Sequence, residues 1–113
     1  MGLSLKNFNA IKASFNTTIN MLGVPAVWSQ AKAPEATANI TVGFKTAGKD
    51  DEEIVNAYGM GAKIITLIDG TTSPAPLKFD RIEIDNEVYT LGAVMPIHLN
   101  GTVIGHKAIA RGE

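Results

Sequence analysis

The sequence predicts a mainly β protein with one N-terminal helix: a small closed or partly open antiparallel β-barrel of about six strands with a long loop insertion. Two observations predict this fold. Apolar residues follow a helical period up to residue 22 and then alternate along short stretches separated by turn residues. Six short strands and one helix cannot hide their edges in an open stack, whereas closure into a barrel removes the edges. With 113 residues, 45% of them hydrophobic, we expect a single domain over 1–113, with the helix at 4–22 and the barrel at 24–110.

The N-terminal helix is predicted from one apolar stripe. Its members recur every three or four residues: Leu5, Phe8, Ile11, Phe15, Ile19 and Leu22. Ser4 suits the N-cap, Gly23 suits a left-handed residue after the last turn, and Pro25 stops the helix. The stripe favours a helix that faces the core. The alternative is an exposed helix that contacts a membrane or a partner.

Short alternating or continuous apolar runs predict the strands, at 24–30, 37–44, 63–69, 79–84, 87–94 and 102–109. The run at 63–69 is apolar on both faces, which indicates a central or interface position. Trp28 and Phe44 are interpreted as core aromatics. The alternative is that they stack nucleobases on a barrel face, but only Lys32 and Lys45 supply positive charge near them.

Turn residues divide the second half of the chain. Asp85-Asn86 suits a two-residue hairpin turn, and Asn100-Gly101 suits one better. We expect Pro96 to end the strand that begins at Glu87. Gly92 and Gly105 lie inside predicted strands, where glycine indicates a bulge or a bend.

Two segments do not serve the predicted core. Residues 45–62 form the long loop, in which four consecutive acids at 50–53 either begin a short helical turn or form a solvated tip. The second loop, 70–76, is rich in Gly, Pro, Ser and Thr. Loops of this length in a compact domain are usually functional.

Composition and motifs exclude several classes of protein. The absence of cysteine excludes disulfides, thiolate zinc sites and cysteine nucleophiles, and a net charge of -1 gives no bulk attraction to nucleic acid. No apolar run is long enough to span a membrane, and the N-terminus lacks the pattern of a signal peptide. His98 and His106 have no second ligand at a metal spacing. We therefore expect no catalytic residue, no cofactor and no metal, and the chain is not expected to be an enzyme.

Charge is unevenly distributed. The first 34 residues carry three lysines and no acid, whereas the remainder carries seven basic and eleven acidic residues. Oppositely charged ends suit a molecule that packs head to tail in a ring, where charge complementarity sets the register. Chance unevenness in a small protein is the alternative.

The C-terminal half resembles a known family. The segment 79–91, FDRIEIDNEVYTL, is similar to the pattern D-x-I-x-I-D-G-x-x-Y-x-V of head–tail joining proteins of tailed bacteriophages, also called head-completion or head-closure proteins. Asn86 stands where the family usually has Gly, and Leu91 where it usually has Val. Residues 94–104 resemble the terminal hairpin of the same family.

The resemblance implies structural work in the virion neck, after assembly in the host cytoplasm. Such proteins form a ring of six or twelve copies that closes the DNA-filled head below the portal or adaptor and offers a docking surface for the tail. The implied partners are copies of itself, the portal or adaptor protein, and a tail-terminator or tail protein. Double-stranded DNA passes the channel without specific binding, and no membrane is involved.

We expect the contacts with these partners to come from the two loops. The predicted interface residues are Lys49, Asp50, Asp51, Glu52, Glu53, Tyr58, Met60, Thr71, Thr72, Ser73 and Pro74. Two other functions stay open. One is a phage tail-terminator or another tail or neck barrel protein, and the other is a small oligonucleotide- or sugar-binding β-barrel module.

Overall fold

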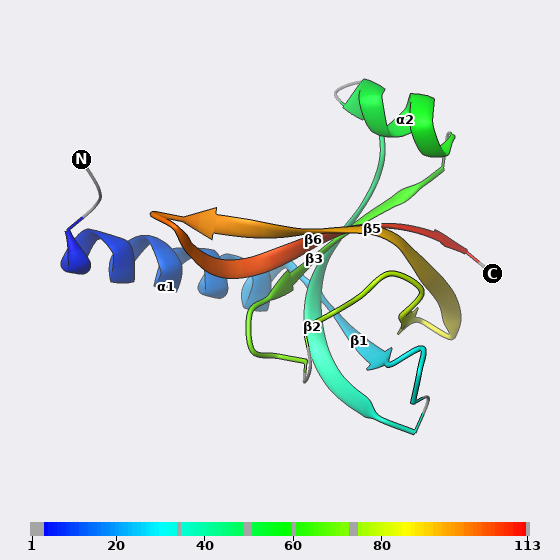
Figure 1. The fold of residues 1–113 in the computed structure, drawn as a ribbon, viewed down its shortest axis with the longest axis horizontal. Coiled ribbons are helices and arrows are strands. Elements are labelled where there is room, and N and C mark those ends of the chain that lie inside the picture. Colours follow the sequence, from blue (N-terminus) through cyan, green and yellow to red (C-terminus); the bar gives the residue numbers. More distant parts are fainter. Residues whose placement is uncertain (1–3, 34, 49–50, 60, 73–74, 113) are drawn as a thin grey trace.

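The fold is a closed six-stranded antiparallel β-barrel flanked by two helices, as a computed structural model describes it for residues 4–33, 35–48, 51–59, 61–72 and 75–112 (Figure 1). The strands follow each other around the barrel in the order β1-β2-β3-β6-β5-β4. The elements are α1 (Leu5–Leu22), β1 (Val24–Ser29), β2 (Thr37–Thr46), α2 (Glu52–Tyr58), β3 (Lys63–Ile68), β4 (Arg81–Ile84), β5 (Glu87–Leu99) and β6 (Thr102–Gly112). The predicted fold class is confirmed.

The barrel interior holds the main hydrophobic core. Its largest buried members include Trp28, Val42, Ile65, Leu67, Ile82 and Leu91. Phe44 is partly buried against this cluster, and its ring lies 5.3 Å from that of Tyr89. Trp28 is 1% exposed. The interpretation of these two residues as core aromatics is therefore confirmed, and Trp28 offers no face on which a base could stack.

A second hydrophobic cluster lies between the barrel and α2. Ile64 of β3 and Ile109 of β6 are buried here, and Ile54, Val55 and Tyr58 pack on them from the short helix. The two apolar faces of β3 are thus explained, because Ile65 and Leu67 point into the barrel while Ile64 lies under α2. Of the two alternatives for the acidic segment, the structure shows the helical turn.

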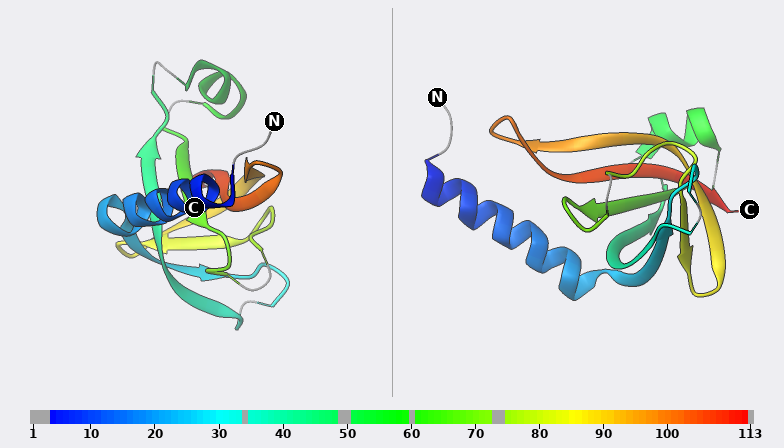
Figure 2. Two further views of the ribbon diagram at one scale, coloured as in Figure 1. Left: turned by 90° about the vertical axis from the view of Figure 1, so that its left-hand side faces the viewer. Right: turned by 60° about the horizontal axis from the view of Figure 1, so that its bottom comes forward.

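Helix α1 lies on the outside of the barrel and extends beyond it, beside the β5–β6 hairpin (Figures 1 and 2). It packs on β2 and β3, with Ile19 close to Gly43 and the Phe15 ring close to Gly105 of β6. None of its residues is buried. The interpretation of a core-facing helix is wrong in this respect. The side chains of the strands fill the barrel interior, so α1 packs only on the outer surface of the barrel.

Gly23 joins α1 to β1 in a way that differs from the prediction. Its N–H donates to the Ile19 carbonyl at 2.8 Å, as a cap should, but its φ of -79° and ψ of 179° are extended and not left-handed. The reason for glycine here is space. A Cβ atom would lie 2.4 Å from the Ile19 carbonyl oxygen and 2.5 Å from that of Val42.

Both predicted hairpin turns are confirmed. Asp85 and Asn86 have φ values of 53° and 67°, and Asn100 and Gly101 have 52° and 81°, as turns of type I′ require. The strands they join differ from prediction. β5 runs through Pro96 to Leu99, and β6 continues to Gly112.

The reason for the longer β5 is that it leaves the barrel. β4 pairs only with residues 87–90 of β5, so beyond them β5 has β6 on one side and no described strand on the other, where the missing N–H of Pro96 costs little. Register shifts between β5 and β6 lie at Leu91/Val94 and at Ile97/His98. They flank Gly92 and Gly105, which confirms the predicted irregularities.

The fourth strand is shorter than predicted. It begins at Arg81, because the chain before it turns sharply: Phe79 has a φ of 77° and its side chain is 62% exposed. The next residue, Asp80, is 2% exposed. This turn places one aromatic residue on the surface and one carboxylate inside the protein.

Candidate interaction surfaces

The acidic part of the predicted interface begins α2. Glu52 and Glu53 form its first turn and are exposed, and Asp51 is half-buried just before it. The helix stands away from the barrel on the side opposite the β1–β2 hairpin (Figure 1). Lys49, Asp50 and Met60 belong to the same predicted interface but lie outside the described residues.

Asp51 is fixed by its neighbours. Its carboxylate accepts a hydrogen bond from the Gly48 N–H at 3.0 Å and lies 3.4 Å from the Lys45 ammonium. The Gly48 hydrogen bond, helped by Lys45, lowers the pKa of the Asp51 carboxyl from its ordinary value of 3.8. The carboxylate therefore holds the turn that leads into α2.

Tyr58, at the end of α2, forms one wall of a small apolar groove. The groove has a volume of about 350 Å³, and its other residues include Phe79, Leu91, Gly92 and Ile109. The Arg111 guanidinium donates to the Tyr58 carbonyl and lies 6.0 Å from the Tyr58 ring. Tyr58 is thus held in place from β6, and the groove has two aromatic walls.

The second predicted segment lies elsewhere. Thr71 is half-buried and its hydroxyl donates to the Ile68 carbonyl at 2.6 Å, whereas Thr72 is only 8% exposed. Thr72 therefore exposes too little surface for a contact with a partner. Ser73 and Pro74 lie outside the described residues.

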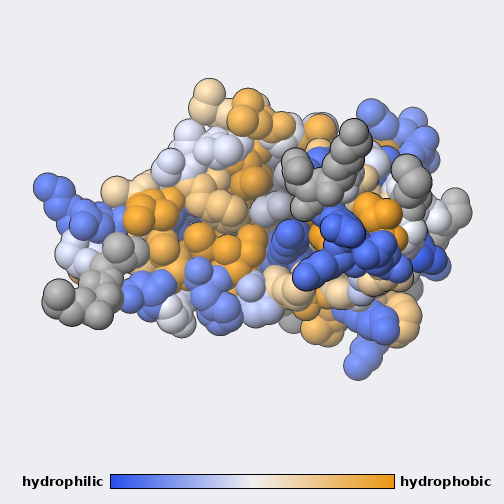
Figure 3. All heavy atoms as spheres, turned by 90° about the horizontal axis from the view of Figure 1, so that it is seen from above, coloured by the Kyte–Doolittle hydropathy of each residue, from blue (hydrophilic) through white to orange (hydrophobic). Residues whose placement is uncertain are grey.

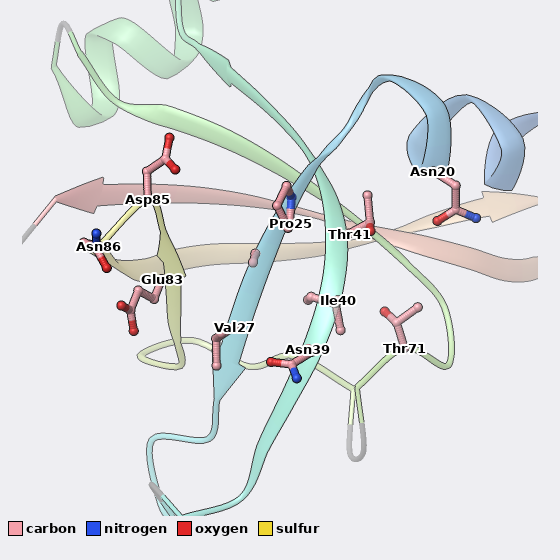
Figure 4. A pocket seen from close by; sticks show the side chains of 11 residues that line it. Asn20, Pro25, Val27, Asn39, Ile40, Thr41, Thr71, Glu83, Asp85 and Asn86 are labelled. Atoms are coloured by element: carbon pink, nitrogen blue, oxygen red, sulfur yellow. The ribbon is translucent and has the colours of Figure 1, made fainter.

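A broad open groove runs over the outer face of β1, β2 and β4, with Asn20 of α1 at its margin (Figure 4). Its volume is about 790 Å³, and its walls include Asn39 and Thr41 on β2, and Glu83 and Asp85 around β4. Thr71 lies at one margin. The groove mixes polar and apolar residues, and its charged residues are the acids Glu83 and Asp85, which does not suit a nucleic acid backbone.

The structure therefore does not bring the two predicted interface segments together. The described part of the α2 segment lies on one side of the barrel, and Thr71 lies beside the open groove on another (Figures 1 and 4). If both segments bind partners, they bind at separate surfaces.

Asp80 is a buried anchor that is absent from the residues predicted for the site. Its carboxylate accepts hydrogen bonds from the Trp28 indole at 3.0 Å, from the Ala31 N–H at 3.0 Å and from the Leu77 N–H at 2.9 Å. It thus ties β1 and the loop after it to the segment before β4. The signal was available, because Asp80 is the first Asp of the pattern in 79–91.

Exposed apolar residues are a second feature of the surface, and those on α1 agree with the alternative of an exposed helix. On α1 they are Leu5, Ile11, Met21 and Leu22; elsewhere they are Val27, Leu77, Phe79 and Met95. Figure 3 shows hydrophobic atoms gathered over the end of the molecule formed by α1 and the β5–β6 hairpin, and hydrophilic atoms toward the end that carries α2. An amphipathic pattern predicts a helix but does not say whether the protein's own core covers the stripe.

The histidines do not form a site. His98 is exposed on β5, and His106 is buried on β6 opposite Leu67. Within the described ranges, no three His, Asp or Glu residues gather in a way that could hold a metal ion. No helix in that part of the chain combines the length and apolar character needed to cross a membrane.

Comparison of the sequence with known protein families and with curated proteins finds no match. The fold, the surfaces and the resemblance of segment 79–91 are the features that bear on function.

Proposed function

We propose that this protein is a structural component of the bacteriophage neck. In this role it forms a ring of six or twelve copies that closes the DNA-filled head below the portal or adaptor and provides the docking surface for the tail. Its partners are copies of itself, the portal or adaptor protein, and a tail-terminator or tail protein, while double-stranded DNA passes through the ring.

The observation that carries the proposal is the place of the resembling segment in the fold. Residues 79–91 supply the buried anchor Asp80, strand β4, the turn at Asp85-Asn86 and the start of β5. The resemblance thus rests on residues that hold the barrel closed. It does not rest on an exposed stretch that any sequence could carry.

The surface supports a role in assembly. The barrel interior is filled by its own side chains, and what projects from it is α1, α2 and the β5–β6 hairpin (Figure 2). Projecting elements with exposed apolar residues suit contacts with other chains. The outer groove carries acids, which suits a protein that must not hold DNA tightly.

The test is a deletion of the gene in the phage or prophage that encodes it. We expect filled heads and separate tails, and we expect the purified chain to restore infectivity when added to a mixture of the two. Normal tailed particles from the deletion strain would contradict the proposal. Heads that package no DNA would also contradict it, because they would place the protein at an earlier step.

A further inference from the structure

The groove between Tyr58 and Phe79, which we call the Tyr58–Phe79 groove, combines apolar walls with positive charge. The Arg111 guanidinium lies 6.0 Å from the centre of the Tyr58 ring. The Lys78 ammonium lies 5.1 Å from the centre of the Phe79 ring. Among the described residues that line the groove, none is acidic. An occupant with an apolar side chain and a nearby carboxylate would therefore complement the groove in both respects.

Arg111 can bind a carboxylate without giving up its contact within the chain. Its guanidinium donates to the Tyr58 carbonyl, and a guanidinium carries more N–H donors than this contact uses. Both Arg111 and Lys78 are exposed, so an incoming anion can reach them. Neighbouring N–H groups of a guanidinium match the two oxygens of a carboxylate, which makes Arg111 the stronger of the two cations for this ligand.

Gly92 keeps the floor of the groove open. A Cβ atom at this position would lie 3.2 Å from the Ile109 carbonyl oxygen and 3.4 Å from the Tyr58 ring. A side chain here would occupy the space between the two aromatic walls. The volume of about 350 Å³ is at the lower end of the range for ligand sites, which suits a single apolar side chain.

Phe79 is exposed in a conformation that is unfavourable for a residue with a Cβ atom, because its φ is 77°. An exposed phenyl ring recovers little of this cost by burial within the chain. Strained, exposed aromatic residues are typical of contact sites. Phe79 thus marks the groove as a surface that binds something.

An open strand edge begins beside the groove. The Leu91 N–H donates to the Asp80 carbonyl at 2.9 Å, and the Leu91 carbonyl accepts from the Phe79 N–H at 2.8 Å. Because the chain turns sharply at Phe79, this pairing stops there, and from Gly92 onward no described strand pairs with this edge of β5. The β5–β6 hairpin carries the edge past the barrel (Figure 2). An extended peptide can pair with such an edge as an added strand.

Pro96 limits how much of this edge a partner can use. It has no N–H to donate, so a strand that pairs along the edge is interrupted there. The stretch between the groove and Pro96 is residues 92–95. The edge is therefore suited to a short segment and not to a long strand.

We propose that the Tyr58–Phe79 groove and the β5 edge at 92–95 together bind a short, extended, acidic segment of another protein. The segment's backbone adds to β5, one of its apolar side chains enters the groove, and a carboxylate lies near Arg111 and Lys78. A nucleic acid is also negatively charged, but it has no peptide groups to pair with a strand edge, so the observations favour a peptide. The inference rests on the proposed neck function, for which it gives the chemistry of the segment that a portal, adaptor or tail protein would present.

The probe for this site is the synthetic peptide acetyl-STVTFDE, added to the isotope-labelled full-length chain and followed by NMR. We expect saturable shifts of the Tyr58, Gly92 and Arg111 signals and slower hydrogen exchange of backbone amides within residues 92–95. The control peptide, acetyl-STVTFNQ-amide, carries no carboxylate and should bind about tenfold more weakly.

Charge reversal at Lys78 tests the groove itself. Lys78→Glu should weaken binding of the acidic peptide by about tenfold, since it places a like charge beside the groove. Lys6→Glu is the matched control, because it changes the net charge equally and Lys6 is exposed on α1 at the other end of the molecule (Figure 1). This control should bind the peptide like the natural chain.

A further variant separates binding from folding. Phe79→Gly removes one wall of the groove and also the backbone strain, so it should raise the midpoint of urea unfolding while it weakens peptide binding by about tenfold. Stability and binding then change in opposite directions, so lost binding does not reflect lost structure.

The inference is overturned by equal binding of the two peptides, by equal effects of Lys78→Glu and Lys6→Glu, or by binding without slower exchange at 92–95. Equally tight binding of a single-stranded oligothymidine would overturn it too, in favour of a nucleic acid. Failure here is distinguishable from failure of the neck function. A chain that restores infectivity to heads and tails but does not bind the acidic peptide keeps its function and lacks this site.

Discussion

A single carboxylate, Asp80, joins parts of the chain that are far apart in sequence. It is 2% exposed and accepts three hydrogen bonds, one from Trp28 across 52 positions. A buried donor that loses its acceptor retains the full cost of its lost hydration. The closure of the barrel between β1 and β4 therefore depends on this residue as well as on the pairing of the two strands.

Asp80→Asn should lower the free energy of unfolding by about 3 kcal/mol, because the new NH₂ group faces donors that need an acceptor. Urea unfolding followed by tryptophan fluorescence measures it. Asp85→Asn is the matched control: Asp85 is exposed at a φ of 53°, which Asn adopts readily, so the change should be small. Equal stabilities of the two variants would contradict the claim that the hydrogen bonds of Asp80 stabilise the barrel.

The Asp51 carboxyl should titrate below its ordinary value of 3.8 in the folded protein. Since the folded pKa is the lower one, its stabilising effect is complete above pH 3.8 and is lost as the pH falls through the folded pKa. NMR titration of the carboxyl carbon measures this directly. Lys45→Met should reverse only part of the shift, because the Gly48 hydrogen bond is the larger cause. A midpoint at or above 3.8 would contradict the described turn.

Among the elements, the strands were predictable because each carries its own pattern. The alternation in β2 and the turns at Asp85-Asn86 and Asn100-Gly101 specify local structure without tertiary context. The residues at which the strands begin and end were less predictable. Pro96 stays in β5 because of what lies beside the strand, and a local pattern does not contain that information.

The candidate site was predictable only in part. Glu52, Glu53 and Tyr58 do project from the barrel on α2, with Asp51 just before it, but Thr72 is buried. The Tyr58–Phe79 groove brings together residues 58, 79, 92 and 109, and no sequence spacing shows that juxtaposition. The sequence could not decide between a core-facing and an exposed α1, because the stripe alone does not show that the barrel core is already complete.

The joint between α1 and β1 gives a prediction at the scale of elements. Gly23→Ala should destabilise the protein by about 1–3 kcal/mol, because its Cβ would press on two backbone carbonyls that cannot move away. Thermal unfolding measures it. Gly48→Ala is the control, since nothing lies within 4 Å of a Cβ there. A Gly23→Ala protein as stable as the control would mean that α1 shifts freely on the barrel.

At the scale of the whole molecule, an oblong particle of 43 × 35 × 24 Å carries basic α1 at one end and acidic α2 toward the other. We propose that copies associate head to tail, as the proposed ring requires; opposite charges at the two ends would make that association depend on salt. Charges alone would orient two copies of the chain but would add little affinity, so apolar contacts between the copies are also needed.

Reversal of these charges tests the orientation. Glu52→Lys with Glu53→Lys should weaken self-association by about tenfold, and Lys6→Glu with Lys12→Glu in the same chain should restore it. Sedimentation equilibrium at low salt measures both. If the second pair of substitutions weakens association further, the two ends do not face each other.

The central claim is that this barrel acts by assembling on a filled phage head. Cryo-electron microscopy of DNA-filled, tailless heads incubated with the purified chain tests it most directly. The account predicts a ring of six or twelve barrels, each of 12.0 kDa, below the portal or adaptor. Heads that bind none of the chain, while it stays a 12.0 kDa monomer in solution, would contradict it.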